Sequence, residues 1–330
     1  MKTAAASALR ILCLAPLVPS AAAAAEWETR VVGEINIGVG VADIDESVGI
    51  GEGVGVFRDG EVQVRAELQA DNGITFGARV ELEAFTDDDQ IDENFGFVSG
   101  PFGTIIVGGA DTALNEHGGI GVVKPTGPYL NYYDDDAGET IPGNPGGFIG
   151  EDDAIGVRYF INFSGFEIGA SYQPDGDADG DEDTNSPQFS EGDVEDQFAV
   201  GASYTGEFGD FGFAVGGGYL TNDEEDQYHV GLEVGFAGFT AAGFFNVDDN
   251  GGAPNEELYG VGAMYATGPY TIGGGYVRTD FTDGGVDEDF FHFGGGYSLA
   301  PGVTAYAAVQ YGEEGDEEGI GGFTWLTLKF

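Results

Sequence analysis

The sequence is a long series of segments in which apolar and polar residues alternate. From Ile74 to Ala84 the apolar residues occupy every second position, and charged or small residues occupy the positions between them. A period of two residues is typical of a β-strand with one apolar face and one polar face. The same period recurs in Val62–Leu68, Phe166–Tyr172 and Tyr228–Val234. The chain is therefore predicted to be all-β, and any fold proposed for it must account for many two-faced strands.

Sixteen segments fit this pattern. The predicted strands lie near Val31–Val41, Glu61–Ala70, Ile74–Phe85, Glu93–Val98, Thr104–Ala110, Ala154–Phe163, Phe166–Gln173, Val194–Tyr204, Phe211–Leu220, Gln227–Gly235, Phe239–Val247, Glu257–Ala266, Tyr270–Thr279, Phe290–Leu299, Val303–Tyr311 and Gly319–Phe330.

The connections between these strands are of two kinds, and the two kinds alternate along the chain. Seven are tight and rich in glycine and proline, as hairpin turns require. The other eight are longer and hold 44 of the 59 acidic residues, namely Asp43–Gly60, Thr86–Asp92, Asp111–Asp153, Pro174–Asp193, Thr221–Asp226, Asp248–Glu257, Asp280–Asp289 and Gly312–Glu318. In an up-and-down antiparallel barrel, every second connection emerges on the same side. We therefore predict a 16-stranded antiparallel transmembrane β-barrel with one acidic rim.

The first 25 residues are predicted to be a secretory signal peptide. Lys2 and Arg10 precede an apolar run from Ile11 to Val18, and a row of alanines follows it. A basic start, a short apolar middle and small residues before the cleavage point are typical of such a segment. Residues 26–330 are then the barrel, and the single cysteine, Cys13, is removed with the signal.

Charge and composition restrict the function further. Without the first 25 residues the chain keeps 8 basic and 59 acidic side chains, a formal charge of −51. A protein with this charge is not expected to bind nucleic acid. The 42% hydrophobic and 13% aromatic content argue against disorder. No later segment approaches the roughly 20 apolar residues of a membrane helix, so a closed barrel is the way this chain could span a membrane.

Three stretches and the end of the chain resemble a known family. The stretches are Ile74–Glu83, Asn94–Thr104 and Gly108–Ala113, and the chain ends with Leu326, Leu328 and Phe330 at alternate positions. These residues resemble the general diffusion porins of Gram-negative outer membranes, of the type found in purple bacteria and other alphaproteobacteria. The resemblance implies an outer-membrane homotrimer whose third long loop, here residues 111–153, folds inward and narrows the pore.

The resemblance also implies a pore constriction in which acids on this loop face arginines on the opposite wall. The acidic candidates are Asp111, Glu116, Asp134, Asp135 and Asp136, and the basic candidates with the parity of the barrel interior are Arg65, Arg79 and Arg158. A second interpretation stays open, in which these arginines simply pair with interior acids such as Glu61, Glu81 and Glu233. Arg278 shares the parity of Tyr276 and is predicted to lie at the outer rim.

The acidic connections raise the question of metal binding. Asp175, Asp177 and Asp179 alternate before Gly180, as in the first half of a calcium loop, but Ser186 stands where a bidentate glutamate is needed. The sequence therefore suggests a weak calcium candidate at these three aspartates and weak, collective binding of calcium or magnesium by the rim. High surrounding salt, in which dense acids are screened, is an alternative origin of the charge.

No organic cofactor and no catalytic residue are predicted. The histidines available as bases are His117, His229 and His292, and the stretch from Gly296 to Ala300 lacks the second glycine of a nucleophile elbow.

The sequence thus favours a water-filled channel for passive diffusion of small hydrophilic solutes and ions, with a preference for cations. Outer-membrane lipid and lipopolysaccharide are its expected surroundings. The alternative is a non-conducting acidic barrel that acts as an adhesin or a divalent-cation-binding surface protein. Glycines at interior parity, such as Gly216, Gly218 and Gly296, either thin the inner wall or relieve strain at bends.

Overall fold

The computed structural model describes residues 26–44, 53–85, 91–121, 155–175, 195–222, 225–250, 255–282 and 284–330. In these ranges the strands are β1 (Glu28–Ile44), β2 (Gly53–Gln69), β3 (Thr75–Glu83), β4 (Asn94–Gly100), β5 (Gly103–Gly109), β6 (Ile155–Phe163), β7 (Phe166–Asp175), β8 (Glu195–Phe208), β9 (Phe211–Thr221), β10 (Glu225–Phe236), β11 (Phe239–Asn250), β12 (Glu256–Thr267), β13 (Tyr270–Phe281), β14 (Glu288–Ala300), β15 (Val303–Glu314) and β16 (Glu317–Lys329). One short helix, α1 (Ala113–Gly118), follows β5.

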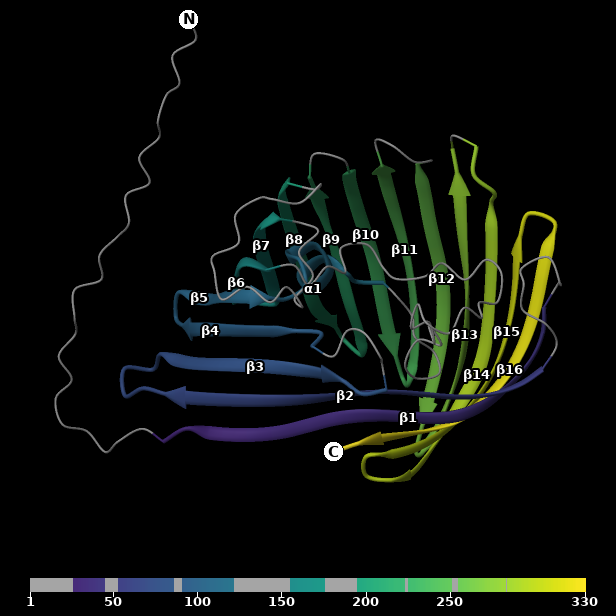
Figure 1. Cartoon of the computed structure of the whole chain (residues 1–330), viewed down its shortest axis with the longest axis horizontal. Coiled ribbons are helices and arrows are strands. Elements are labelled where there is room, and N and C mark those ends of the chain that lie inside the picture. Colours follow the sequence, from purple (N-terminus) through teal and green to yellow (C-terminus); the bar gives the residue numbers. More distant parts are fainter. Residues whose placement is uncertain are drawn as a thin grey trace, which may run out of the picture.

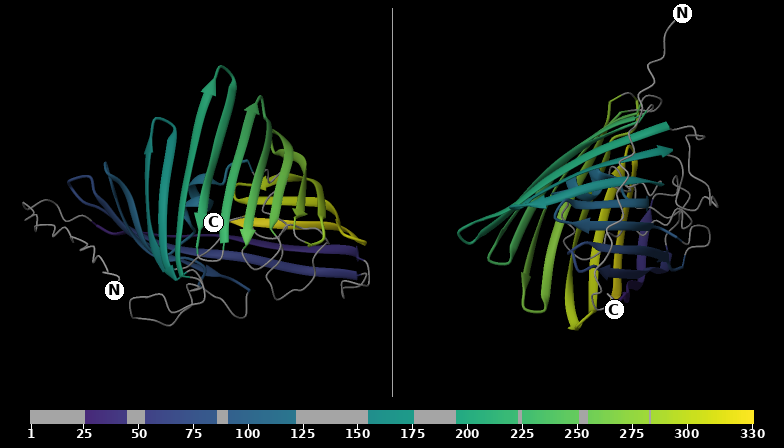
Figure 2. Two further views of the ribbon diagram at one scale, coloured as in Figure 1. Left: turned by 90° about the horizontal axis from the view of Figure 1, so that it is seen from above. Right: turned by 90° about the vertical axis from the view of Figure 1, so that its left-hand side faces the viewer.

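The sixteen strands form one closed antiparallel barrel (Figures 1 and 2). Each strand pairs with its neighbours in sequence, and β1 pairs with β16 to close the ring. At this seam the backbones of Gly33 and Phe330 exchange two hydrogen bonds of 3.0 Å. Closure gives each of these strands a hydrogen-bonded neighbour on both sides, which is how a sheet satisfies its backbone groups in hydrocarbon. The predicted fold class is confirmed.

The two faces of the barrel differ as the alternation predicted. Exposed apolar side chains such as Val64, Ile168 and Val230 point outward. The interior positions hold buried polar side chains, namely Asn36, Gln63, Glu81, Arg158, Ser171, Gln173, Gln197, His229, Asn246, Thr279, Gln310 and Thr327. In the part of the chain that the structure describes, no helix has the length and hydropathy needed to cross a membrane.

Several connections are shorter than predicted, and two of the acidic ones show this clearly. β2 begins at Gly53 and not near Glu61, because Gly53–Gly60 continues the pairing with β1 as far as the Ala42–Gly53 partners. Val54 and Val56, which are 79% and 80% exposed, extend the apolar outer face of this strand. At the other end of the chain, β15 and β16 pair up to Glu314 and Glu317, so a two-residue turn replaces most of the predicted acidic connection Gly312–Glu318.

Candidate pore constriction

The chain enters the barrel directly after β5. Thr112 caps the start of α1, where its side chain accepts a hydrogen bond of 3.4 Å from the Asn115 backbone N–H. Ala113, Leu114 and His117 are buried against the inner wall. The helix lies inside the barrel next to β7, β8 and β9 (Figure 1). An inward third connection, which the resemblance implied, is therefore present in its described part, residues 110–121.

Glycines on the inner face make room for this segment. An added Cβ at Gly218 would lie 2.7 Å from Cδ1 of Leu114, and one at Gly216 would lie 2.5 Å from Cγ1 of Ile120. Gly201 leaves similar space for the helix backbone. A Cβ added at this glycine would lie 2.8 Å from the Gly118 nitrogen. Real Cβ contacts are not this short, so side chains at these positions would push the helix off the wall. The segment of α1 therefore packs against these glycines. The set Gly201, Gly216 and Gly218 is called the glycine bed below.

Two polar side chains of the wall hold the backbone at the start of the loop. Arg158, 5% exposed, donates from Nη1 to the Asp111 carbonyl oxygen at 2.6 Å. Ser171 accepts a hydrogen bond of 2.9 Å at its Oγ from the Ala113 backbone N–H. Both bonds satisfy backbone groups that are buried and that the short helix leaves unpaired.

Two histidines hold the helix and the residues after it. The Nδ1 atom of His117 lies 2.7 Å from a carboxylate oxygen of Glu167 on β7. His229 on β10 donates from Nε2 to the Ile120 carbonyl oxygen at 2.8 Å, and its other ring nitrogen contacts Asn246. Burial lowers the pKa of His117 below its usual value, against the opposing effect of the hydrogen bond to Glu167. His117 therefore acts as a neutral N–H donor near neutral pH.

A polar cavity of about 380 Å³ lies between α1 and the wall formed by β2, β3 and the start of β4. Its lining carries six carboxylates and one guanidinium, from Glu61, Gln63, Arg79, Glu81, Asp92, Glu93, Asp111, Asn115 and Glu116. The passage beside the helix is therefore strongly acidic, and we name it the acidic gap.

The three arginines predicted for the constriction lie at different places in the barrel interior. Arg79 faces the acidic gap, where it pairs with Glu81 and lies 2.8 Å from Glu93. Arg65 is the next interior residue on β2 beyond Gln63 and donates to the Gln63 side chain from Nε at 2.8 Å. Both arginines therefore stand on the wall across from the helix.

Arg158 lies beneath the helix, with its guanidinium 4.0 Å from Glu116. Asp111 and Glu116 both line the acidic gap, and their part in a pore constriction stays a prediction. The candidates Asp134, Asp135, Asp136, Asp177 and Asp179, and the side chain of Asp175, lie outside the described residues.

Sequence reasoning did not find the roles of Glu93 and Asp92. Asp92 is the last residue of the acidic connection after β3 and Glu93 follows it, and the pairing of β3 with β4 brings both beside Arg79. Burial raises the pKa of Glu93 above its ordinary value, and the nearby guanidinium of Arg79 opposes this effect. Glu61, Glu81 and Asp92 each offer an oxygen atom within 4.8 Å of the others, a spacing at which carboxylates attract a cation.

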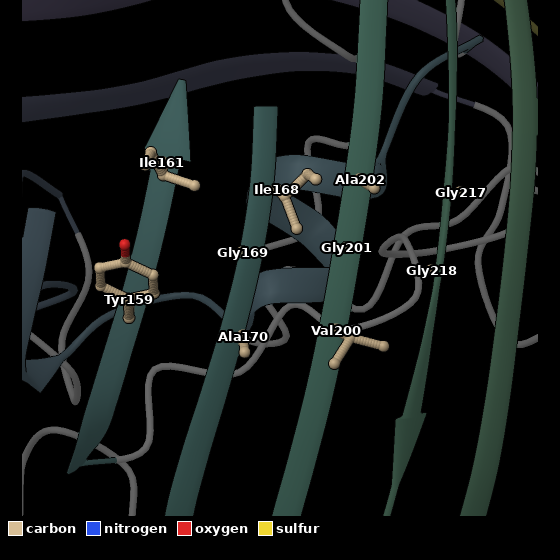
Figure 3. Close-up of a pocket in the computed structure, with 10 residues that line it drawn as sticks. All are labelled: Tyr159, Ile161, Ile168, Gly169, Ala170, Val200, Gly201, Ala202, Gly217 and Gly218. Carbon is tan, nitrogen blue, oxygen red and sulfur yellow. The ribbon is translucent and has the colours of Figure 1, made fainter. Parts of the chain in front are cut away.

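The outer face behind the glycine bed is hollowed. Figure 3 shows Tyr159, Ile168 and Val200 around a shallow groove of about 290 Å³, with Ala170 and Ala202 between them. The wall is thin here because glycines face inward and alanines face outward. The groove is apolar, which suits contact with hydrocarbon.

Comparison with solved structures supports the fold over nearly the whole chain. A loop-deletion mutant of OmpT, an outer membrane protein of Vibrio cholerae, superposes with a TM-score of 0.65 at 15% identity, covering 92% of this chain and 99% of that chain. An anion-selective porin from Comamonas acidovorans gives a TM-score of 0.65 at 15% identity, covering 92% and 100%. A mutant of Rh. blastica porin gives 0.63 at 18%, with the same coverage of 92% and 100%.

Sequence comparison identifies the family. The search of curated proteins gives no significant match. A family model described as Gram-negative porin matches residues 5–317. With the closed 16-stranded barrel, this match shows that the chain belongs to the Gram-negative porins, which form diffusion channels in the outer membrane.

Proposed function

We propose that this porin passes small hydrophilic solutes and ions by diffusion and that it prefers cations. The observation that carries the proposal is the acidic gap, whose lining has six carboxylates and one guanidinium. Fixed negative charge along a narrow aqueous passage raises the local concentration of cations and lowers that of anions. In this function no covalent bond of the solute is made or broken. The protein keeps the passage open and determines the charge of the passage wall.

The basic side of the passage is weak for two reasons. Arg79 is compensated by its two carboxylate partners, Glu81 and Glu93. Arg158 is buried and bound to the backbone of the loop, so little of its charge reaches the aqueous passage. These contacts argue against anion selectivity, although one structural neighbour is described as an anion-selective porin.

Reversal potentials in planar bilayers test the proposal. Folded protein is inserted between unequal KCl solutions, and the sign of the zero-current potential gives the preferred ion. Stable current steps with a potential of the sign set by K⁺ support the proposal, and a potential set by Cl⁻ contradicts the cation preference. An absence of current from folded protein would favour the non-conducting adhesin or surface protein.

We further propose that the barrel assembles as a homotrimer among lipids and lipopolysaccharide and binds calcium or magnesium weakly. One structural neighbour, OmpT folded in vitro, is described as a trimer form, with a TM-score of 0.60 at 15% identity. Chemical crosslinking of the detergent-extracted protein should give a trimer band, and only monomer bands would contradict this. Calorimetric titration with Ca²⁺ measures the binding of divalent cations.

A further inference from the structure

Two pairs of aromatic side chains lie on the inner face of β2, β15 and β16. The ring centroids of Phe57 and Phe323 are 6.3 Å apart, and Tyr306 stacks on Trp325 at 5.0 Å. Phe323 and Trp325 are successive inward residues of β16. Trp325 is 3% exposed, whereas the other three rings are half-buried. We call these four residues the aromatic patch.

Glycines on neighbouring strands hold these rings against the wall. A Cβ at Gly40 would lie 2.6 Å from Cδ1 of Phe323, and a Cβ at Gly296 would lie 2.8 Å from Cδ1 of Tyr306. One side of each ring therefore covers backbone. The remaining exposure of these half-buried rings is toward the interior, because their positions have interior parity.

The aromatic patch and α1 occupy different sectors of the barrel. The helix contacts β7 to β10, whereas the patch spans β15, β16 and β2, which lie across the ring in the order of strands. The order of strands therefore places α1 on one side of the interior and the aromatic patch on the other.

Charge beside the patch indicates which solutes it would hold. Asp59 is the next inward residue after Phe57 on β2, and its exposed carboxylate accepts a hydrogen bond of 3.1 Å from Asn36. Aromatic faces attract cations through the ring quadrupole, and a carboxylate adds to this attraction. The formal charge of −49 also enriches cations inside the barrel.

We infer that the aromatic patch with Asp59 is a binding site for small organic cations that carry an alkylated ammonium group. The inference rests on the proposed function, because the solute must enter the interior. A neutral solute could also lie on the rings, but it would gain nothing from Asp59 or from the field of the barrel.

Block of the K⁺ current tests this site. Choline is added to the wild-type channel in planar bilayers, and 3,3-dimethyl-1-butanol, its neutral isostere, is added in a parallel experiment. The expected result is saturable block by choline alone. Phe57→Leu combined with Phe323→Leu should raise the half-blocking concentration of choline roughly fivefold, because the variant loses a moderate cation–aromatic attraction. Asp59→Asn, which keeps all the rings, should also weaken block.

Phe244→Leu is the matched control. Phe244 also faces inward over a glycine, Gly260, but it is 9% exposed and belongs to a different part of the wall. Block of this variant should equal that of the wild type. Equal block of the wild type, the Phe57/Phe323 variant and Asp59→Asn would overturn the inference, and equal block by the neutral isostere would replace it with a site for neutral solutes.

A second measurement separates this inference from the proposed function. Saturation-transfer NMR detects choline bound to the detergent-extracted barrel whether or not the protein conducts. Binding that is lost in the Phe57/Phe323 variant supports the site even if no current is found. A conducting wild type that neither binds choline nor is blocked by it leaves the porin function intact and removes this site.

Discussion

At the scale of single residues, the charge of a pore is decided by the partners of each ionic side chain. Arg79 stands between Glu81 and Glu93 in the acidic gap, and it is the one guanidinium of that lining. Its removal would take away the guanidinium that pairs with both carboxylates. Arg30, in contrast, pairs with Glu28 at an exposed position near the start of β1.

We expect Arg79→Ala to make the channel more cation-selective without unfolding the barrel. One unit charge at about 4 Å in a wet interior is worth about 1 kcal/mol or less, which corresponds to a rise in the K⁺/Cl⁻ permeability ratio of roughly twofold to fivefold. Reversal potentials measure the ratio, and Arg30→Ala is the control for loss of one positive charge. An unchanged reversal potential would remove Arg79 from the constriction.

His117 gives the docked loop a dependence on pH. Because burial lowers its pKa when the helix is docked, the undocked loop binds a proton more readily. The docked state is therefore fully favoured above the ordinary value of 6.5 and loses stability as the pH falls below it.

We expect the wild-type channel to change its current noise or conductance as the pH falls from about 7 toward 5, because protonated His117 weakens the docking of α1. Single-channel recording over this pH range measures the change. His117→Gln, which keeps a donor for Glu167 but does not titrate in this range, should reduce that change. His292→Gln on β14 should retain it. If His117→Gln responded to pH like the wild type, the dependence would have another source.

At the scale of elements, α1 is held more by the shape of the wall than by its own sequence. Six residues are too few for a stable isolated helix. Its position comes from the glycine bed and from the side chains of Arg158, Ser171, His117 and His229. The candidate pore constriction therefore depends on β6 to β10 as much as on α1.

Gly218→Ala should displace α1 and change the single-channel conductance, because the added methyl group would collide with the Val200 carbonyl oxygen of β8 and with Leu114 of the helix. Overpacking of this kind costs about 1–3 kcal/mol. Gly212→Ala is the matched control, since Gly212 lies on the inner face of the same strand with no atom within 4 Å of its Cβ position. Equal conductance in both variants would show that the helix does not depend on this bed.

Much of the barrel could be predicted from the sequence, and the reason is local. The two-residue alternation in segments such as Ile74–Ala84 indicates which face of each strand contacts hydrocarbon. The tight turns indicate which strands are neighbours in the sheet. The start of β2 is not predictable in this way. The Gly-Val repeat at Gly53–Val56 has no polar side chains on its inner face, so it lacks the apolar–polar alternation that indicates a strand.

The constriction was less predictable, because it depends on contacts between distant segments. The resemblance gave the inward loop, and it named Asp111 and Glu116 as candidates that line the acidic gap. It could not give the fit of Leu114 to Gly218, which requires the register of β8, β9 and β10. Nor could it show that Arg158 would bind the loop backbone instead of facing the acidic gap.

At the scale of the whole molecule, the acid excess acts over distances set by salt. The whole chain has a formal charge of −49. The screening length falls from about 10 Å at 0.1 M salt to about 3 Å at 1 M.

The K⁺/Cl⁻ permeability ratio should therefore decline when the KCl concentration is raised from 0.1 M to 1 M at a fixed gradient. Charges in the acidic gap, which lie directly beside the passage, should preserve part of the selectivity at high salt. Reversal potentials measured over a concentration series check both statements. A ratio independent of salt would assign the selectivity to pore size and not to charge.

The seam between β1 and β16 is paired in the same antiparallel way as every other joint of the wall. The barrel is thus a ring without an inherent first strand. If a peptide joined Phe330 to the start of β1 at Glu28, the polypeptide could be opened at another hairpin, such as the one at Ala237 and Gly238, and a circularly permuted chain should rebuild the same cylinder.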